Sequence, residues 1–319
     1  MCYSAQIWAD YRRYVRTFGA HMDIAEFARL YFLQAEGSGA KTPKALDDAF
    51  LDPQTDGERE IRQLIEKTRA EQRTKLEQDL FKQRTRFTEA ERKLESKVTK
   101  AATESRRIAT DKIEAALRRI EDINRSESKP RDSRIFPGYY APVLVMENGE
   151  YVLRPMRYQC RIAGTPASFD VKYPGTYNAR KNSLGGFWKS CFGQTHGVLL
   201  VEVFYENVKK AKMEGTVLES HDKDENVVLE FRPSNRQLMH VACLWSRWTK
   251  PGEPDLLSFA AITDDPPPEV EAAGHDRCII PIKPENIEAW LNPEATSLDA
   301  MYAILDDKDR PYYEHKFAA

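Results

Sequence analysis

The sequence predicts an α+β fold in which a mainly antiparallel β domain carries a long, charged helical insertion. Residues 57–125 contain no proline and no glycine after Gly57, as a continuous helical segment requires. After Pro130, short apolar runs alternate with turn-forming residues, which is typical of β-strands. Hydrophobic residues make up 41% of the 319 positions, enough for a substantial core.

Charge and cysteine usage exclude several classes of protein. The net charge of −2 conceals an asymmetry, because residues 57–125 hold 19 Lys and Arg against 14 Asp and Glu. No basic field therefore covers the whole chain. Cysteines 2, 160, 191, 243 and 278 lack the spacing of a zinc site or a disulfide framework. No signal peptide or membrane-length apolar run is visible, so we expect a cytoplasmic protein without a metal or other cofactor, and no membrane association.

The first 56 residues divide into a structured part and a linker. Asp23 is placed to cap the N-terminus of a helix. The apolar face of that helix comprises Ile24, Phe27, Leu30 and Tyr31. From Glu36 to Asp56 the chain is interrupted by glycine, serine and proline, which indicates a linker.

Residues 57–125 repeat apolar side chains at a heptad-like spacing. The positions concerned are Leu80, Phe87, Leu94, Ala101, Ile108, Ile113, Leu117, Ile120 and Ile123. The pattern predicts one long exposed helix or a coiled-coil hairpin that breaks near Thr88, where Thr88-x-x-Glu91 could form a capping box. The hairpin is favoured if both flanks belong to one domain, because the insertion must return to its start. The segment is a candidate for self-association, for a protein partner or for nucleic-acid contact.

The C-terminal part reads as a sheet followed by a helix. The expected strands are 142–146, 151–153, 198–205, 227–231, 238–244 and 257–263, all rich in β-branched and aromatic residues. A short helix over 284–291 begins with Pro284, whose missing N–H costs little in a first turn. We therefore expect residues 1–50 and 130–319 to form one domain, with 57–125 inserted into it.

The second residue offers unusual chemistry. Removal of Met1 would leave Cys2 with a free α-amine and a thiol on adjacent carbons, a 1,2-aminothiol that no internal residue provides. The amine condenses with an aldehyde, and the thiol then closes a thiazolidine ring. Reference pKa values of about 8 for the amine and about 8.5 for the thiol give both groups a reactive form near neutral pH.

Three later segments place polar side chains at the ends of β-strands or turns. Asn178-Ala-Arg180 follows a Pro-Gly turn, Glu206 ends an apolar strand, and His275 precedes the apolar run Cys278–Ile282. A glutamate and a histidine are the ordinary pair for proton transfer near pH 7. Taken singly, each of these residues is more often structural than catalytic.

In this order, the motifs resemble the SOS response-associated peptidase (SRAP) family. They are an N-terminal Met-Cys, Asn-Ala-Arg, an aromatic pair followed by Glu206, Ala242-x-Leu-Trp245, Ile262-Thr263 and His275-Asp-Arg277. The resemblance implies a protein that recognises abasic sites in single-stranded DNA, joins the nucleoid when it acts there, and traps the open-chain aldehyde as a thiazolidine. It also implies autocatalytic exposure of the N-terminal cysteine.

The resemblance further implies a role for each residue. Cys2 is the nucleophile, Asn178 orients it, Glu206 is the general acid/base, and His275 shuttles a proton. Arg180 and Arg277 contact phosphates beside the lesion, and the further candidates for DNA contact are Arg157, Tyr158 and Lys181.

The sequence also departs from the family pattern. Tyr3-Ser4 stands where the family usually has Gly-Arg, so a phosphate-contacting arginine beside the nucleophile is absent, and residues 157–160 contain no tryptophan. Two other readings stay open at this point. One is an N-terminal-nucleophile amidohydrolase such as a glutamine amidotransferase domain, although residues 3–35 show no glycine-rich oxyanion region. The other is a non-enzymatic coiled-coil adaptor.

Overall fold

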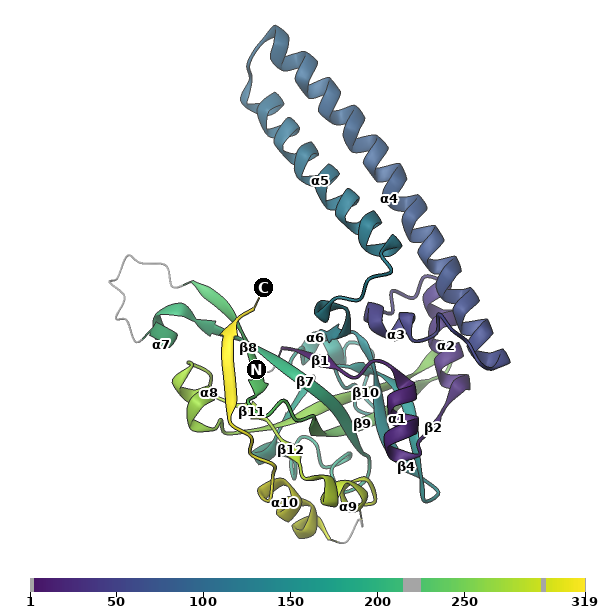
Figure 1. Ribbon diagram of the computed structural model, residues 1–319, viewed down its shortest axis with the longest axis vertical. Helices are drawn as coiled ribbons and strands as arrows, with labels where there is room; N and C mark the ends of the chain where they lie inside the picture. The colour runs from purple at the N-terminus through teal and green to yellow at the C-terminus, as the bar shows by residue number, and fades with distance from the viewer. Residues whose placement is uncertain (1–2, 215–224, 294–296, 319) are drawn as a thin grey trace.

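The computed structural model describes residues 3–214, 225–293 and 297–318, and these combine a large β-sheet with a projecting pair of helices (Figure 1). Five strands of the sheet form a closed ring. They are β4 (Tyr140–Glu147), β5 (Glu150–Tyr158), β7 (His196–Lys209), β9 (Met239–Lys250) and β10 (Glu253–Asp264). The ring closes because β7 pairs with both β4 and β9. Because the ring is closed, each of these five strands pairs with two neighbours, and none of them is an edge strand of the ring.

Shorter strands extend this ring near its long strands. Along β7 lie β1 (Ser4–Ile7) and β8 (Asn226–Pro233); β3 (Arg134–Ile135) pairs with β1, and β13 (Tyr313–Phe317) pairs with β8. Along β10 lie β6 (Asn178–Arg180) and β11 (Cys278–Ile279). β12 (Pro281–Ile282) pairs with β9, and β2 (His21–Met22) pairs with β5. Most pairs are antiparallel, as expected, but β10 runs parallel to β5 and β6, and β2 runs parallel to β5.

Five of the six expected strands lie within observed strands, and the sixth, 238–244, begins one residue before β9. These apolar runs become strands that are buried on both faces, so consecutive residues such as Val143, Leu144 and Val145 all lie in the core. The expected helix over 284–291 is present as a 3₁₀ turn, η3 (Pro284–Asn286), followed by α9 (Ile287–Leu291). The prediction of a mainly antiparallel β domain with a long helix is confirmed.

The N-terminal helices are capped as their sequences indicate. α1 (Tyr11–Phe18) begins at Asp10, and α2 (Ile24–Ala35) begins at Asp23, whose carboxylate accepts from the backbone N–H of Glu26. Phe27 and Tyr31 on the expected apolar face of α2 are fully buried. Each cap satisfies a backbone donor that the first helical turn leaves unpaired.

The expected linker over residues 36–56 is more structured than its composition indicates. It contains α3 (Lys44–Asp48), and the side chains of Leu46 and Phe50 are fully buried. Interpreting the whole segment as a linker was therefore wrong. Glycine and serine at 37–39 interrupt the chain, but the two large apolar residues further on anchor it to the core.

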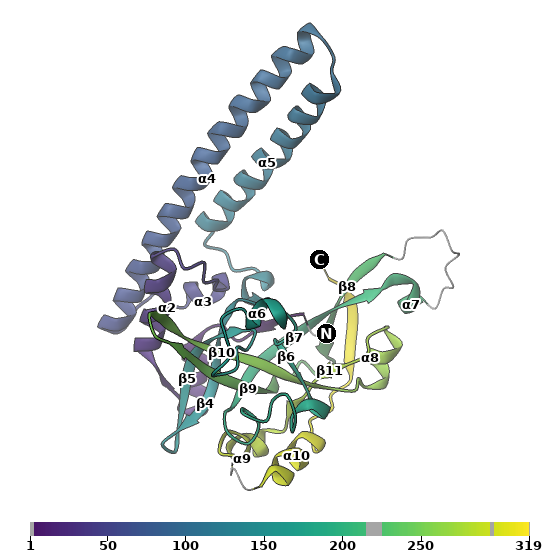
Figure 2. The ribbon, with the colours of Figure 1, turned by 180° about the vertical axis from the view of Figure 1, so that it is seen from behind.

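The charged segment forms two helices that lie side by side and project from the β domain (Figures 1 and 2). α4 (Asp56–Ser96) is followed by α5 (Lys100–Asn124), whose N-terminus is capped by Thr99. The first turns of α4 belong to the core, since Ile61 and Ile65 are buried. The division of the chain at residue 57 stays a prediction, as does a coiled-coil supercoil.

The expected break near Thr88 was wrong. Thr88 lies inside α4, where its hydroxyl donates to the carbonyl of Arg84 at 3.1 Å. The Thr-x-x-Glu pattern is ambiguous because a threonine hydroxyl also bonds to the preceding turn within a helix. The spacing restarts at the true turn, so Ala101 is exposed and Ala102 is buried.

The remaining helices border the sheet. They are η1 (Pro130–Ser133), α6 (Phe169–Lys172), η2 (Lys181–Ser183), α7 (Lys210–Glu214), α8 (Pro268–Ala272) and α10 (Leu298–Asp306). In the described part of the chain, no helix is both long enough and apolar enough to cross a bilayer.

Candidate active site

Glu206 and His275 meet in a buried contact next to strand β1. Nε2 of His275 lies 3.1 Å from Oε2 of Glu206, and the side chains are 6% and 0% exposed. Strand β7 supplies Glu206. His275 follows a turn after α8, where Gly274 has a φ of 98° that L side chains rarely adopt. The expected acid–base pair is thus brought together from positions far apart in the sequence.

The second ring nitrogen of His275 determines where its proton resides. Nδ1 lies 2.8 Å from the carbonyl oxygen of Arg277, and a carbonyl can only accept, so Nδ1 carries a hydrogen and donates it. Burial lowers the pKa of His275 to about 4, which favours the neutral ring at pH 7. Nε2 then offers a lone pair to Glu206, and the contact between them requires one shared proton.

The first described residues lie directly beside this pair. Ser4 pairs with Tyr205 in the antiparallel ladder between β1 and β7, and Tyr205 precedes Glu206. The ring of Tyr3 contacts that of Tyr177 at a centroid distance of 6.3 Å. Cys2 lies outside the described residues.

Asn178 directly follows Tyr177, whose ring contacts that of Tyr3. It begins β6, which is held against β10 by pairing with Ala261. Its Oδ1 accepts from the hydroxyl of Tyr158 at 3.4 Å, and Tyr158 also packs edge-on against Tyr177. Tyr3 and Ser4 therefore contact the sequence neighbours of Asn178 and of Glu206, respectively.

The four basic candidates for DNA contact already have acidic partners. Arg157 pairs with Asp170, Arg180 with Asp265, Arg277 with Asp276, and Lys181 with Asp264 and Asp306. The Arg180–Asp265 pair is exposed and contributes little to stability, so an incoming phosphate can replace its carboxylate at small cost, whereas Arg157 and Asp170 are each only 16% exposed.

The aromatic candidates fall into two groups. Tyr158 is 3% exposed and stacks on Phe259, so its ring belongs to the core in this conformation. Trp188 is also buried, whereas Phe187 is 42% exposed and contacts Tyr173. Of these two neighbouring rings, only that of Phe187 is therefore accessible for stacking against a base.

The described cysteines, at positions 160, 191, 243 and 278, are buried and free of disulfides. Burial raises the pKa of Cys243 and Cys278 well above the ordinary thiol value. Raised pKa values disfavour the thiolate, so neither residue has the properties of a reactive nucleophile.

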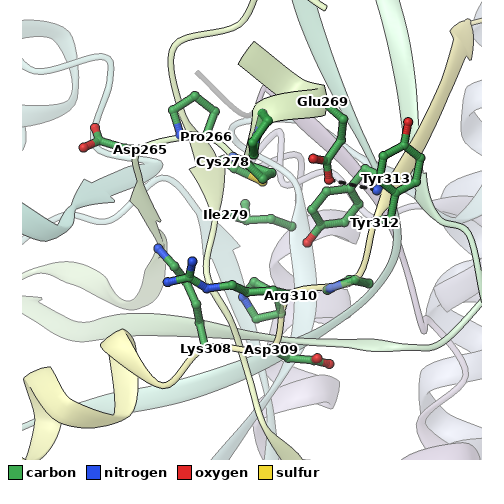
Figure 3. A pocket seen from close by; sticks show the side chains of 14 residues that line it. Asp265, Pro266, Glu269, Cys278, Ile279, Lys308, Asp309, Arg310, Tyr312 and Tyr313 are labelled. Atoms are coloured by element: carbon green, nitrogen blue, oxygen red, sulfur yellow. Dashed lines mark hydrogen bonds between the residues drawn. The ribbon is translucent and has the colours of Figure 1, made fainter. Parts of the chain in front are cut away.

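A cavity of about 370 Å³ lies beside the strand that follows His275 (Figure 3). Cys278 and Ile279 contribute to its lining, and Glu269 accepts from the backbone N–H of Tyr313 at 3.0 Å. Asp265, the partner of Arg180, stands at its border. The cavity thus adjoins one of the expected phosphate contacts.

Sequence reasoning missed Arg134 on β3. Its Nε and Nη2 atoms donate to Oγ of Ser4 at 3.0 and 2.9 Å, and its guanidinium lies 3.6 Å from the centroid of the Tyr205 ring. No local pattern distinguishes Arg134 from the other arginines nearby. Only the pairing of β3 with β1 brings it to the start of the chain.

Comparison with protein families assigns the chain to a known family of peptidases. The family model described as SOS response associated peptidase (SRAP) matches residues 97–316, more than half of the chain. The chain belongs to this family, whose members are associated with the SOS response to DNA damage. The matched region contains Asn178, Glu206 and His275, but neither Cys2 nor α4.

Three solved structures are similar to this chain. A protein from Bordetella bronchiseptica is 15% identical with a TM-score of 0.46, over 61% of this chain and 90% of its own. A protein from Bacteroides thetaiotaomicron is 12% identical with a TM-score of 0.46, over 59% and 78%. A phage-related protein from Bordetella bronchiseptica is 18% identical with a TM-score of 0.43, over 61% and 85%. No curated protein matches the chain.

Proposed function

We propose that this protein senses abasic sites in single-stranded DNA and captures them covalently through a thiazolidine formed by Cys2. The observation that carries the proposal is the buried Glu206–His275 pair beside the first strand of the chain. Membership of a peptidase family linked to DNA damage supports it. A non-enzymatic adaptor has no need of an acid–base pair buried at this place, and hydrolysis of glutamine by the mature protein would favour the amidohydrolase instead.

Covalent connectivity limits how far Cys2 can lie from the pair. Two residues of extended chain span at most about 7 Å, and Ser4 is held opposite Tyr205, next to Glu206. This limit is compatible with the proposed exchange of a proton between Cys2 and the pair.

The proposed capture has two bond-forming steps. The α-amine of Cys2 attacks C1′ of the ring-opened sugar, and the resulting hemiaminal loses water to give an imine. The thiolate then attacks the imine carbon, and the nitrogen takes up the proton that the thiol has lost. One water leaves overall, and no oxidant or reductant is needed.

The acid–base pair supplies the proton transfers. In our proposal Glu206 takes a proton from the attacking amine and returns one to the departing hydroxyl of the hemiaminal. His275 holds that proton between steps, since its Nε2 faces Glu206 while Nδ1 is engaged with the Arg277 carbonyl. Asn178, oriented by Tyr158, aligns the nucleophile. Positioned proton transfer of this kind contributes about 10²–10⁴-fold to rates.

Exposure of Cys2 is the earlier reaction of the same site. Hydrolysis of the Met1–Cys2 peptide bond consumes one water, releases methionine and leaves the new α-amine. We propose that Glu206 acts here as the base that activates this water. One carboxyl group would thus serve both the self-processing and the capture.

The basic residues would hold the DNA strand. Arg180 and Arg277 lie two residues after Asn178 and His275 in the sequence, so they would bind phosphates near the reacting sugar. Arg157 and Lys181 would extend this path. Each would exchange a carboxylate partner for a phosphate on binding.

A denaturing gel tests the proposal. Single-stranded DNA with one abasic site is incubated with protein whose intact mass confirms loss of Met1. We expect a heat-stable band of retarded DNA with the wild type and none with Cys2→Ser. DNA with an intact base serves as the control for substrate. Absence of the band with the mature wild-type protein would refute the proposal.

A further inference from the structure

Arg134 is a half-buried arginine without an acidic partner in the described part of the chain. Its guanidinium lies between aromatic rings, 3.6 Å from the centroid of Tyr205 and 5.0 Å from that of Phe136. Burial lowers its pKa from the ordinary arginine value. The charge of Glu230 reaches it, but Glu230 instead contacts Tyr205 and Lys316.

The hydrogen bonds of Arg134 leave much of the guanidinium available. A guanidinium has five N–H donors. Nε and Nη2 each direct one of them at Oγ of Ser4. Among the described residues the other three N–H groups have no acceptor, so they remain for water or for an anion. A partly desolvated cation of this kind binds an anion more strongly than a fully hydrated one does.

The surroundings fix this guanidinium in one orientation. β3 pairs with β1 so that Gln6 lies opposite Arg134, and the two bonds to Ser4 together with the ring of Tyr205 restrain the side chain. Little side-chain freedom is left to lose when an anion binds. Moreover, Ser4 is only two residues from Cys2.

We infer that Arg134 forms an anion site for a phosphodiester group of the DNA strand, beside the nucleotide that Cys2 captures. The inference rests on the function proposed above and names a contact for it. Arginine is suited to this role because its planar fork matches the oxygens of a phosphate. Ser4, which holds the fork, is a positioning residue.

This site accounts for a departure of the sequence. Tyr3-Ser4 stands where an arginine is usual in the family, and Arg134 brings a guanidinium to Ser4 from another strand. The charge beside the nucleophile is thus present although the residue at position 4 is neutral.

Salt dependence of binding tests the inference. The probe is a single-stranded oligonucleotide with a tetrahydrofuran analogue in place of the abasic sugar, which has no aldehyde and binds without crosslinking. Arg134→Gln is compared with the wild type and with Arg131→Gln, an exposed arginine paired with Asp122. Loss of one phosphate contact reduces the slope of log K against log salt by about 0.7 on a single strand.

We expect Arg134→Gln to bind about tenfold more weakly, with the reduced slope, and Arg131→Gln to bind like the wild type. Arg134→Lys keeps the charge, so its slope should match the wild type while its affinity falls. Arg134→Lys leaves a cation between the rings, so it should fold even if Arg134→Gln does not. Its lower affinity then tests the inference.

Neutral methylphosphonate linkages locate the contact. One linkage near the analogue should weaken wild-type binding and have no further effect on Arg134→Gln. Two results would overturn this inference alone, provided that the wild type crosslinks abasic DNA. One is a slope of log K against log salt that is the same in Arg134→Gln as in the wild type. The other is a neutral linkage near the analogue that weakens binding by Arg134→Gln as much as binding by the wild type. A wild type that neither binds nor crosslinks abasic DNA would overturn the proposed function as well.

Discussion

Oε2 of Glu206 and Nε2 of His275 lie 3.1 Å apart in a site closed to solvent, and the other nitrogen of His275 donates to a backbone carbonyl. One proton must therefore reside between the two side chains. This arrangement makes the pair a unit, in which a change to either member alters the proton that the other holds.

The pair yields a first prediction. Glu206→Gln keeps the size and polarity of the side chain but cannot exchange a proton. We expect it to retain Met1 and, when Cys2 is exposed by another route, to crosslink abasic DNA at least about 100-fold more slowly. Intact mass and the initial rate of crosslinking measure the two effects. Full removal of Met1 at the normal rate in a strain without methionine aminopeptidase activity on this sequence would contradict the role in processing.

His275 yields a second prediction. In the proposed reaction Glu206 exchanges protons with the reacting groups, whereas His275 holds the proton between steps, so the loss of His275 should slow the reaction less than the loss of Glu206. We expect His275→Gln to slow crosslinking about 10- to 100-fold and to change its dependence on pH, since the group that shares the proton is gone. Rates measured from pH 5 to 8 check this. A rate that is lowered equally at every pH would indicate a purely structural role.

Variants of Asn178 and Tyr158 test whether Asn178 orients the nucleophile or only supports the fold. Asn178→Ala removes the amide, and Tyr158→Phe removes only the hydroxyl that donates to it. We expect the first to slow crosslinking about tenfold or more and the second only a few-fold, because the hydrogen bond at 3.4 Å is long. Melting temperatures provide the control. A slower reaction in Tyr158→Phe than in Asn178→Ala would reverse the proposed order of roles.

The buried side chain of His196 should make the free energy of unfolding depend on pH. The backbone N–H of Gly193 donates to its Nε2, its Nδ1 faces the carbonyl of Trp290, and burial lowers its pKa to about 4. Its ordinary pKa of about 6.5 applies in the unfolded chain, which therefore binds the additional proton as pH falls. Stability contributed by neutral His196 is present above about pH 6.5 and is lost between pH 6.5 and 4.

The full loss amounts to about 3 kcal/mol of unfolding free energy by the end of that interval. Urea unfolding at several pH values measures it. His196→Gln should be less stable at pH 7 and should show a weaker decline below pH 6.5. An unchanged decline in His196→Gln would assign the effect to other groups.

The packing of α5 against α4 leads to a further prediction. Ala102, Ala109 and Ala116 repeat every seven residues and are buried along α5. Ala109→Leu inserts bulk where α5 meets α4, and overpacking of this kind costs about 1–3 kcal/mol. Hydrogen exchange should become faster in α5 and stay unchanged in β7. Lys112→Leu, at an exposed position of the same helix, is the control, and equal exchange in both variants would contradict close packing at Ala109.

Some parts of this structure follow from local patterns in the chain. Asp23 caps α2 because a carboxylate before an apolar helical face satisfies the first backbone donors. The runs that became β4, β7 and β10 have the continuous apolar character and the β-branched content of buried strands. By contrast, the linker and the turn near Thr88 were misjudged, since glycine content and a four-residue cap pattern do not reveal what tertiary contacts will bury.

The sequence by itself determined the class of fold, most of its strands, and the identities and order of Asn178, Glu206 and His275. Those properties depend on side-chain type and on spacing along the chain. The tertiary structure alone decided that Glu206 touches His275 and that Arg134 reaches Ser4. Such contacts depend on which strands pair and in what register, and these are set by the packing of the whole core and not by neighbouring residues.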